Sequence, residues 1–459
     1  MGAHARVGRA MPAGRKWVAP GGIAALSFSL IVSTTGAHAA GFALREYSLS
    51  AEGSAFAGAS AMSDEPGGLS YNAATSSGVG DWDMSSTLNA IYPASTGTFT
   101  TATTSFGTPT GGSSSVREIQ DAYEPGLQLR YRLAPQWTAG LSVTAPFGLG
   151  TKYADDWAGR YYALESKLIT VNASPSLAYQ LTPELTLAAG AQVEYAAGTL
   201  SNAIDFGTIG AANFVPGSVP GTQDGKAEFS PTGWAYGYTL GALWQPSPDV
   251  RIGAAYRSEL HHELDGNVDF TLDSAGIGAA LASASGAFVD TKGRSKVTLP
   301  AVASTGIAYD VTRQLSLMAE FDYTWWSSFD ELRIKFANPF QPDDFQTYDY
   351  NNTYFASLGL RYRPSAAWVL RAGIAFDQSP TRDATRDPRI PDADRKWIAF
   401  SVGYWLTDRS ELELGYARLM FPTEPIALLA STPGNEVRGN LIGSTKADAD
   451  VITLQLTFK

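Results

Sequence analysis

The sequence predicts an all-β protein: a fourteen-stranded antiparallel transmembrane β-barrel with an N-terminal segment, or hatch, inside its lumen. Three observations indicate this fold class. Apolar and polar side chains alternate along many short segments, and the connections between these segments alternate between short and long. The composition combines 12% aromatic residues with only 17% charged residues. Soluble domains carry about a quarter charged residues, whereas a barrel in lipid requires an apolar band and aromatic girdles.

Residues 1–39 are predicted to be a cleaved secretory signal. The first part carries four basic residues and no acidic residue: Arg6, Arg9, Arg15 and Lys16. An apolar stretch over residues 21–32 follows, and the segment ends in Ala37-His38-Ala39, which fits the small-x-small rule for cleavage. The alternative is an uncleaved membrane anchor, but the apolar stretch is too short to span a bilayer comfortably. We therefore expect export and a mature chain that begins at Ala40.

The composition also excludes several classes of function. The chain has no cysteine, so it can form neither a disulfide nor a thiolate metal site. Its net charge of −11 becomes more negative once the basic signal is removed, and such an acidic chain is a poor nucleic-acid binder. The sequence contains no phosphate loop or dinucleotide fingerprint, and we expect no cofactor and no metal.

Period-two alternation is the dominant local pattern, and it places successive side chains on opposite faces of a strand. At the C-terminus, four apolar residues alternate with mostly polar ones: Ile452, Leu454, Leu456 and Phe458. A second stripe has aromatic residues at both ends: Trp234, Tyr236, Tyr238, Leu240, Ala242 and Trp244. This pattern is typical of a lipid-facing strand with girdle residues at each membrane interface.

Fourteen such segments follow the predicted hatch, within residues 81–459. They lie near 82–92, 124–133, 137–147, 165–179, 185–199, 232–246, 250–269, 295–309, 314–333, 353–363, 368–377, 395–406, 410–420 and 448–458. Every second connection is a short turn, and the others are long. A barrel with an even number of strands predicts this order, with short turns in the periplasm and long loops outside. A Greek-key sandwich gives no reason for such regular alternation.

Residues 40–80 do not fit the strand pattern. They are rich in glycine, alanine and serine, yet they contain Phe42, Tyr47, Phe56 and Tyr71. A flexible periplasmic leader would not need these apolar anchors, so we expect the segment to fold back into the lumen as a hatch.

Several sequence blocks resemble the FadL-type long-chain fatty acid transporters, a family that includes TodX-type channels for aromatic hydrocarbons. The resemblance begins at Ala40-Gly41-Phe42 and continues through Gly53–Gly58 and Ser70–Ala74. Later blocks occur in the same order over the mature chain: Asp155–Arg160, Tyr256–Glu259, Tyr323–Ser327, Arg371–Asp377 and Ile390–Trp397. The resemblance implies a fourteen-stranded barrel in the bacterial outer membrane, with a hatch that helps to bind a hydrophobic ligand. The hatch residues implied are Phe42, Phe56, Asn72, Ala73 and Ala74.

The resemblance also implies a route for the ligand. Family members pass a hydrophobic molecule from outside to a site in the barrel, and they release it sideways through an opening at an inward kink of the third strand. Here that strand runs into Pro146-Phe147-Gly148. Proline cannot donate a ladder hydrogen bond and glycine tolerates a bend, so both residues are reasonable breakers of the wall. The alternative is that they only end the strand.

Two departures from the family pattern bear on the ligand. The family hatch usually has Asn-Pro-Ala where this chain has Asn72-Ala73-Ala74, so the bend loses the rigidity of proline. Some members place basic residues near the ligand carboxylate, and we find Asn202 and Thr347 at the corresponding places. Because a buried carboxylate without a cation is costly, a neutral hydrocarbon stays as open as a fatty acid.

A polar cluster is predicted from Asp377, Asp392, Asp394 and Arg395, which lie at the end of one strand and just before the next. It could face the lumen near the hatch and the kink, or it could belong to a solvated loop with weak ion pairs.

The predicted function is therefore diffusion-driven uptake of hydrophobic small molecules by a monomeric barrel surrounded by lipid and lipopolysaccharide. The alternatives are a general aqueous porin and a surface adhesin or receptor that uses the long loops. Catalysis is not expected, because the mature chain has only His261 and His262 to serve a Ser–His system.

Overall fold

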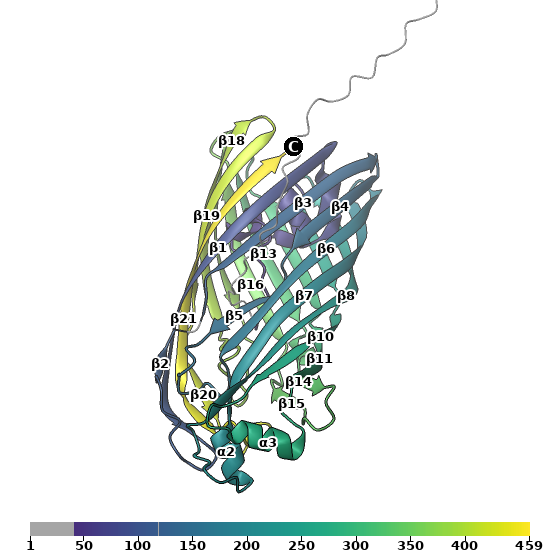
Figure 1. Cartoon of the computed structure of the whole chain (residues 1–459). Coiled ribbons are helices and arrows are strands. Elements are labelled where there is room, and N and C mark those ends of the chain that lie inside the picture. Colours follow the sequence, from purple (N-terminus) through teal and green to yellow (C-terminus); the bar gives the residue numbers. More distant parts are fainter. Residues whose placement is uncertain (1–40, 118) are drawn as a thin grey trace, which may run out of the picture. The chain divides into compact units, whose positions relative to one another are not determined.

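The computed structural model describes residues 41–117 and 119–459, so the predicted signal lies outside the described residues. The described strands form one sheet of 21 elements, and β1 pairs with β21 to close it into a barrel (Figure 1). All ladders between neighbouring strands are antiparallel. Some barrel strands consist of two consecutive elements, so the closed barrel has fourteen strands, and each of the fourteen predicted segments lies in one of them.

The strands are β1 (Trp82–Thr103), β2 (Ser115–Val116), β3 (Ala122–Ala134), β4 (Trp137–Thr144), β5 (Gly148–Lys152), β6 (Glu165–Thr182), β7 (Leu185–Asp205), β8 (Asp224–Ser247), β9 (Val250–Arg257), β10 (Leu260–Thr271), β11 (Thr291–Leu299), β12 (Val302–Asp310), β13 (Leu315–Thr324), β14 (Glu331–Phe336), β15 (Asp344–Thr347), β16 (Thr353–Tyr362), β17 (Trp368–Asp377), β18 (Arg395–Thr407), β19 (Ser410–Met420), β20 (Glu424–Leu428) and β21 (Asn440–Phe458). The helices are α1 (Leu49–Glu52), η1 (Ala59–Ala61), η2 (Pro66–Ser70), η3 (Ala73–Gly78), α2 (Phe206–Ala212), α3 (Ile277–Ser285) and η4 (Trp326–Ser328). Among the described residues, no helix is both long and apolar enough to cross a membrane.

The outer face of the barrel carries the predicted apolar stripes. Ile452 and Leu454 are 47% and 45% exposed, whereas the intervening Thr453 is fully buried. Trp82 and Tyr92 are exposed on β1, and Trp234 and Trp244 are exposed on β8. Each pair is ten residues apart, about 33 Å along a strand. With the usual tilt of about 40°, that length matches an apolar band about 25 Å tall.

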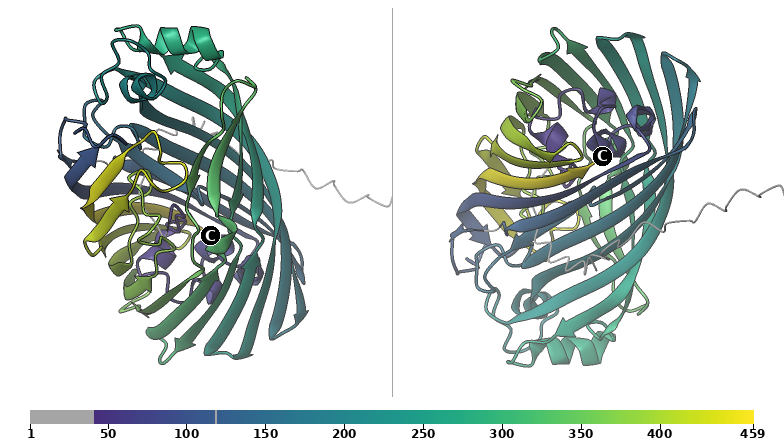
Figure 2. Two further views of the ribbon diagram at one scale, coloured as in Figure 1. Left: turned by 90° about the horizontal axis from the view of Figure 1, so that it is seen from below. Right: turned by 90° about the horizontal axis from the view of Figure 1, so that it is seen from above.

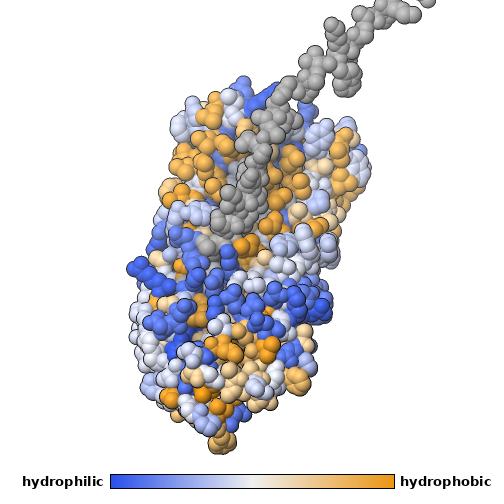
Figure 3. Space-filling view, in the orientation of Figure 1, coloured by the Kyte–Doolittle hydropathy of each residue, from blue (hydrophilic) through white to orange (hydrophobic). Residues whose placement is uncertain are grey.

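Figure 3 shows hydrophobic residues gathered over the half of the barrel that carries the short turns, with a more hydrophilic zone beside it. Strands continue past the apolar band, where they leave the region that lipid would cover. β1 extends to Thr103 and β21 begins at Asn440, so both strands are longer than the predicted 82–92 and 448–458. The prediction was too short because the parts outside the apolar band carry no apolar stripe.

The hatch, described from residue 41, lies inside the barrel (Figure 2). Asn72 Nδ2 donates to the β8 carbonyl of Ala242 at 2.9 Å, and the Oε1 of Gln455 on β21 accepts from Leu49 N at 2.9 Å. Inward-facing glycines allow the two backbones to meet. A Cβ on Gly253 would lie 1.8 Å from the carbonyl oxygen of Ser60, and one on Gly373 would lie 2.0 Å from that of Ser54.

Four barrel strands are interrupted. The sequence predicts the kink in the third strand, but it predicts the other three strands as continuous. The breaks fall at residues 145–147, 258–259, 300–301 and 325–330. Pro300 has no N–H to donate to a ladder. At the second break, Ser258 Oγ accepts from Tyr238 N at 2.9 Å, so a side chain takes the place of a backbone partner. The breaks lie along the lumen, where they shape the cavities described next.

Candidate functional site

An apolar cavity lies on the outer side of the hatch. Its lining includes Phe42 from the hatch together with barrel and loop residues: Leu149, Leu168, Ala196, Leu200, His262, Leu264, Val297, Leu299, Phe329, Leu332 and Ile390. The barrel residues in this lining belong to β5, β6, β7, β10, β11 and β14, so the barrel wall encloses the space on several sides. A cavity lined in this way accepts the hydrocarbon part of a ligand.

A second pocket continues from the apolar cavity toward the outer loops, since Leu200 and Leu332 line both. It is lined by Arg389 and Arg438. Arg438 pairs with Asp344 and donates to Gln346 Oε1 at 2.6 Å. We call this space the head-group pocket, because it places charge at the end of an apolar cavity.

Arg389 differs from its neighbour because no carboxylate of the described residues lies within ion-pair distance of its guanidinium. It donates to Asn202 Oδ1 at 3.1 Å and to Ser166 Oγ at 3.2 Å, and the residue is 5% exposed. Burial lowers the pKa of Arg389. The inference that the lumen lacks a cation near Asn202 is therefore wrong: the cation comes from the loop before β18, not from β7.

Phe42 lies among aromatic side chains at the apolar cavity. Its ring packs edge-on against Trp326 and Phe329, with centroids 5.0 and 5.2 Å apart, and it lies 5.9 Å from the ring of Phe147. The same side chain lines the apolar cavity.

The other predicted hatch residues have different surroundings. Phe56 is 1% exposed and packs against Phe355 and Trp397, which anchors the hatch to the barrel wall. Phe56 lines neither the apolar cavity nor the head-group pocket. Asn72 caps η3 by accepting from Ala74 N at 3.0 Å, which helps to fix the bend where proline is missing. Ala73 lines a cavity beside the hatch, and Ala74 is buried in the packing between hatch and barrel.

The third barrel strand is broken between β4 and β5. Residues 145–147 leave the ladder, and the backbone of Phe147 forms an antiparallel bridge with Ala43 of the hatch. Leu44 N donates to Pro146 O, and Gly148 N donates to Phe42 O, both at 2.9 Å. The kink thus turns inward and pairs with the first residues of the hatch.

The break leaves part of the wall without a strand-to-strand ladder. β3 pairs with β4 from Leu127 onward, but its residues 122–126 pair only with β1. β5 pairs with β6 on one side. On the other side it has no ladder: Gly148 N donates to Phe42 O of the hatch, and Thr151 forms an isolated bridge. We call this region the wall gap. Pro146 and Phe147 also line a cavity beside the hatch, which we call the exit cavity.

The predicted polar cluster is largely assembled. Arg395 Nη2 lies 3.2 Å from Asp392 Oδ1, and its Nε lies 3.6 Å from Asp377 Oδ2, with all three residues buried. Asp392 Oδ2 also accepts from Gly41 N at 2.8 Å, so the cluster holds the start of the described hatch. Asp394 is exposed and instead accepts from Ser379 N at 2.8 Å.

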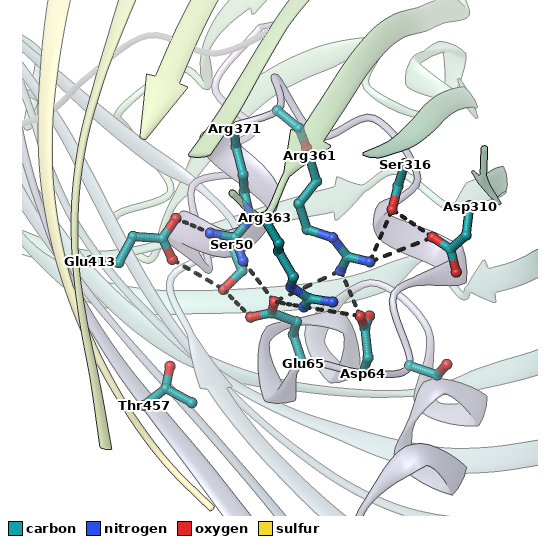
Figure 4. Close-up of polar contacts among 12 residues, drawn as sticks. Ser50, Asp64, Glu65, Asp310, Ser316, Arg361, Arg363, Arg371, Glu413 and Thr457 are labelled. Atoms are coloured by element: carbon teal, nitrogen blue, oxygen red, sulfur yellow. Dashed lines mark hydrogen bonds and ion pairs between the residues drawn. The ribbon is translucent and has the colours of Figure 1, made fainter. Parts of the chain in front are cut away.

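A further ion-pair network, which sequence reasoning did not find, fixes the hatch at the end with the short turns (Figure 4). Arg371 Nη2 lies 2.7 Å from Glu65 Oε1, and Arg361 Nη1 lies 2.6 Å from Asp64 Oδ2. Arg363 contacts both carboxylates, at 3.3 and 3.4 Å. We call this network the latch. No signal in the sequence marks it, because its acidic and basic members are about 300 residues apart.

Acid should release the latch. Burial opposes ionisation of Glu65, but the charge of Arg371 outweighs it and lowers the pKa of Glu65 from 4.5 to about 2. A depressed carboxyl pKa contributes stability above the ordinary pKa of 4.5, and this contribution is lost as the pH falls toward 2. Protection of hatch amides from hydrogen exchange is expected to fall over that range. The variant Glu65→Gln should weaken this acid response, with Asp64 still paired to Arg361, whereas Glu184→Gln, in an exposed turn, should keep the whole response.

The histidines give no sign of catalysis. His262 Nε2 lies 3.1 Å from Glu194 Oε1 in the buried wall, and His261 is an exposed neighbour of Glu259. Among the described residues, no group of three or more His, Cys, Asp or Glu side chains is arranged to hold a metal.

Comparison with known proteins gives a consistent picture. The chain is 28% identical over 411 residues to the long-chain fatty acid transport protein of Escherichia coli O6:H1 (strain CFT073), covering 85% of this chain and 89% of the relative. It is also 28% identical over 425 residues to outer membrane protein P1 of Haemophilus influenzae (strain Rd), covering 86% and 89%.

Solved structures share the fold. A FadL homologue of Pseudomonas aeruginosa superposes with a TM-score of 0.83 at 24% identity, covering 91% of this chain and 99% of the other. The toluene transporter TodX of Pseudomonas putida superposes with a TM-score of 0.65 at 18% identity, covering the same shares.

The model of one family, described as outer membrane protein transport protein (OMPP1/FadL/TodX), matches residues 30–459. This is a family of outer-membrane transport proteins and not of enzymes, in agreement with the function class that the sequence predicts. The chain therefore belongs to the OMPP1/FadL/TodX family and is an outer-membrane β-barrel for the transport of hydrophobic compounds.

Proposed function

We propose that this chain takes up long-chain hydrophobic acids, such as fatty acids, and releases them sideways into the outer membrane through the wall gap. The observation that carries the choice of ligand is the buried guanidinium of Arg389, which has no carboxylate partner among the described residues. The name of the E. coli relative, a long-chain fatty acid transport protein, supports the same choice.

Arg389 provides the electrostatic part of the argument. A buried charge without a partner is costly, so natural proteins pair such groups or use them to bind a ligand of opposite charge. A ligand carboxylate in the head-group pocket would supply the missing partner. Charge-assisted hydrogen bonds of this kind contribute about 1.5–3 kcal/mol each.

The apolar cavity accounts for the rest of the ligand. Asn202, beside Arg389, and Ala196, in the cavity lining, lie six residues apart on β7, which is about 20 Å along a strand. An alkyl chain that extends from the head-group pocket toward Phe42 would be removed from water over this length. Each buried CH₂ group contributes about 0.8 kcal/mol.

The wall gap supports lateral release. A ligand that entered the periplasm would lose the free energy gained by leaving water, whereas passage into lipid keeps it. The kink of residues 145–147 and the missing ladder beside β3 supply a place in the wall where the ligand can pass once residues 42–44 move. The barrel closes within one chain, which supports a monomer surrounded by lipid and lipopolysaccharide.

Two other functions receive less support. A neutral hydrocarbon, as in the toluene transporter TodX, would fit the apolar cavity but would leave Arg389 unpaired. An aqueous porin requires an open lumen, whereas the hatch lies across this one and is held by the latch. Nothing in the long loops specifically favours an adhesin.

The variant Arg389→Gln tests the proposed ligand. Purified protein should bind a fluorescent long-chain acid about tenfold or more weakly, because about 1.4 kcal/mol corresponds to a factor of ten. Binding of the methyl ester of the same acid should stay unchanged, since the ester carries no charge. Equal affinities of the variant and the wild-type protein for the acid would overturn the proposal, and exposed Arg294→Gln serves as a matched control.

A further inference from the structure

A second arginine faces the lumen without a carboxylate partner among the described residues. Arg257 ends β9, and the alternation of this strand directs it inward together with Arg251, Gly253 and Ala255. It lines the exit cavity with Pro146 and Phe147. Its guanidinium lies 3.5 Å from Tyr47 Oη, a weak contact with a neutral group.

The other charged side chains that line the exit cavity are already paired. Arg45 Nη1 lies 2.7 Å from Asp322 Oδ2, and Arg45 also stacks on Phe355 at 3.8 Å. Asp377 pairs with Arg395. Arg257 is therefore the group in this cavity whose positive charge is left for a ligand.

A short chain of contacts connects Arg257 to the wall gap. Tyr47 Oη donates to Leu44 O at 2.7 Å, and Leu44 N donates to Pro146 O at 2.9 Å. The backbone of Tyr47 contacts β3. The carbonyl oxygen of Tyr47 accepts from Gln128 Nε2 at 3.0 Å, and a Cβ on Gly126 would lie only 2.4 Å from the same oxygen. Tyr47 thus lies between Arg257 and residues 122–126 of β3, which form no ladder on the side of β4.

We propose that Arg257 forms a second binding site for the carboxylate of the ligand, occupied while the alkyl chain enters the wall gap. The proposal rests on the proposed function, because it assumes an acidic ligand and a lateral exit. Arg389 lies in the head-group pocket, at the outer end of the apolar cavity, and Arg257 lies in the exit cavity. Phe42 and the hatch residues that follow it lie between the two arginines. A carboxylate that leaves Arg389 must cross an apolar region, and a second cation lowers the cost of that step.

The test compares Arg257→Gln with Arg257→Lys in a strain that lacks the endogenous transporter. Two labelled compounds of equal chain length are supplied, a long-chain acid and the corresponding alcohol. We expect Arg257→Gln to slow uptake of the acid about tenfold, the effect of one charge-assisted hydrogen bond, and to leave uptake of the alcohol unchanged. Arg257→Lys should keep most of the acid uptake, because it retains the charge.

The affinity of the head-group pocket for the acid should be the same in purified Arg257→Gln as in the wild-type protein, since Arg389 and its surroundings are unchanged. Normal acid uptake by Arg257→Gln would overturn the second site, and so would equal loss of acid and alcohol uptake, which indicates a structural role. Failure of the proposed function has a different signature. In that case the wild-type protein itself does not take up the acid, or Arg389→Gln binds it normally.

Discussion

Replacing Gly253 and Gly373 by valine is expected to turn the plugged barrel into a leaky pore. A Cβ at either position would collide with a hatch carbonyl oxygen, at 1.8 Å for Ser60 and 2.0 Å for Ser54. The obstacle is backbone, which cannot rotate away as a flexible side chain can. The double variant should therefore keep its strands but fail to seat the hatch against β9 and β17.

Single-channel recording in planar bilayers measures this effect. The wild-type protein should show little conductance, and the Gly253→Val/Gly373→Val variant should show large, steady, ohmic currents. Ala254→Val and Ala372→Val are matched controls on the same two strands, since their side chains face away from the hatch, and they should behave like the wild-type protein. A heat-modifiable double variant that stays silent would show that the hatch does not depend on these glycines.

The barrel was predictable from the sequence because lipid imposes a strong rule on its outer face. Residues such as Ile452 and Leu454 must be apolar wherever hydrocarbon surrounds the strand. The sequence of such a strand therefore alternates between apolar and polar residues. Beyond the apolar band the rule no longer applies. Polar stretches such as residues 93–103 of β1 still form ladder hydrogen bonds, but they carry no stripe that sequence analysis could detect.

The candidate site was only partly predictable. Phe42, Pro146 and Gly148 were found because local residue types and a family resemblance mark them. Arg389 was missed because its partner Asn202 is 187 residues away, and only the folded chain brings the loop before β18 against β7. The latch and Arg257 were missed for the same reason: their meaning depends on which other charges lie nearby.

A disulfide between the hatch and the kink is expected to stop uptake reversibly. Ala43 and Phe147 face each other as a non-hydrogen-bonded antiparallel pair, because the flanking bonds join Leu44 N to Pro146 O and Gly148 N to Phe42 O. The Cα atoms of such a pair lie about 4.5 Å apart, within the range that a disulfide can bridge. The chain has no native cysteine, so Ala43→Cys/Phe147→Cys introduces one defined cross-link.

The two single-cysteine variants are the matched controls. Each alters one side chain without joining the segments, and each should respond to neither oxidant nor reductant. Any loss of uptake shared by the single variants and the reduced double variant would reflect the changed side chains and not the lock.

Uptake of a labelled long-chain acid by cells carrying the double-cysteine variant tests lateral release most directly. If the ligand leaves through the wall gap, residues 42–44 must separate from the kink. Oxidised cells should then lose uptake, and reductant should restore it to the level of the reduced control. Undiminished uptake by oxidised cells, with the cross-link verified by mass spectrometry, would contradict release through this gap.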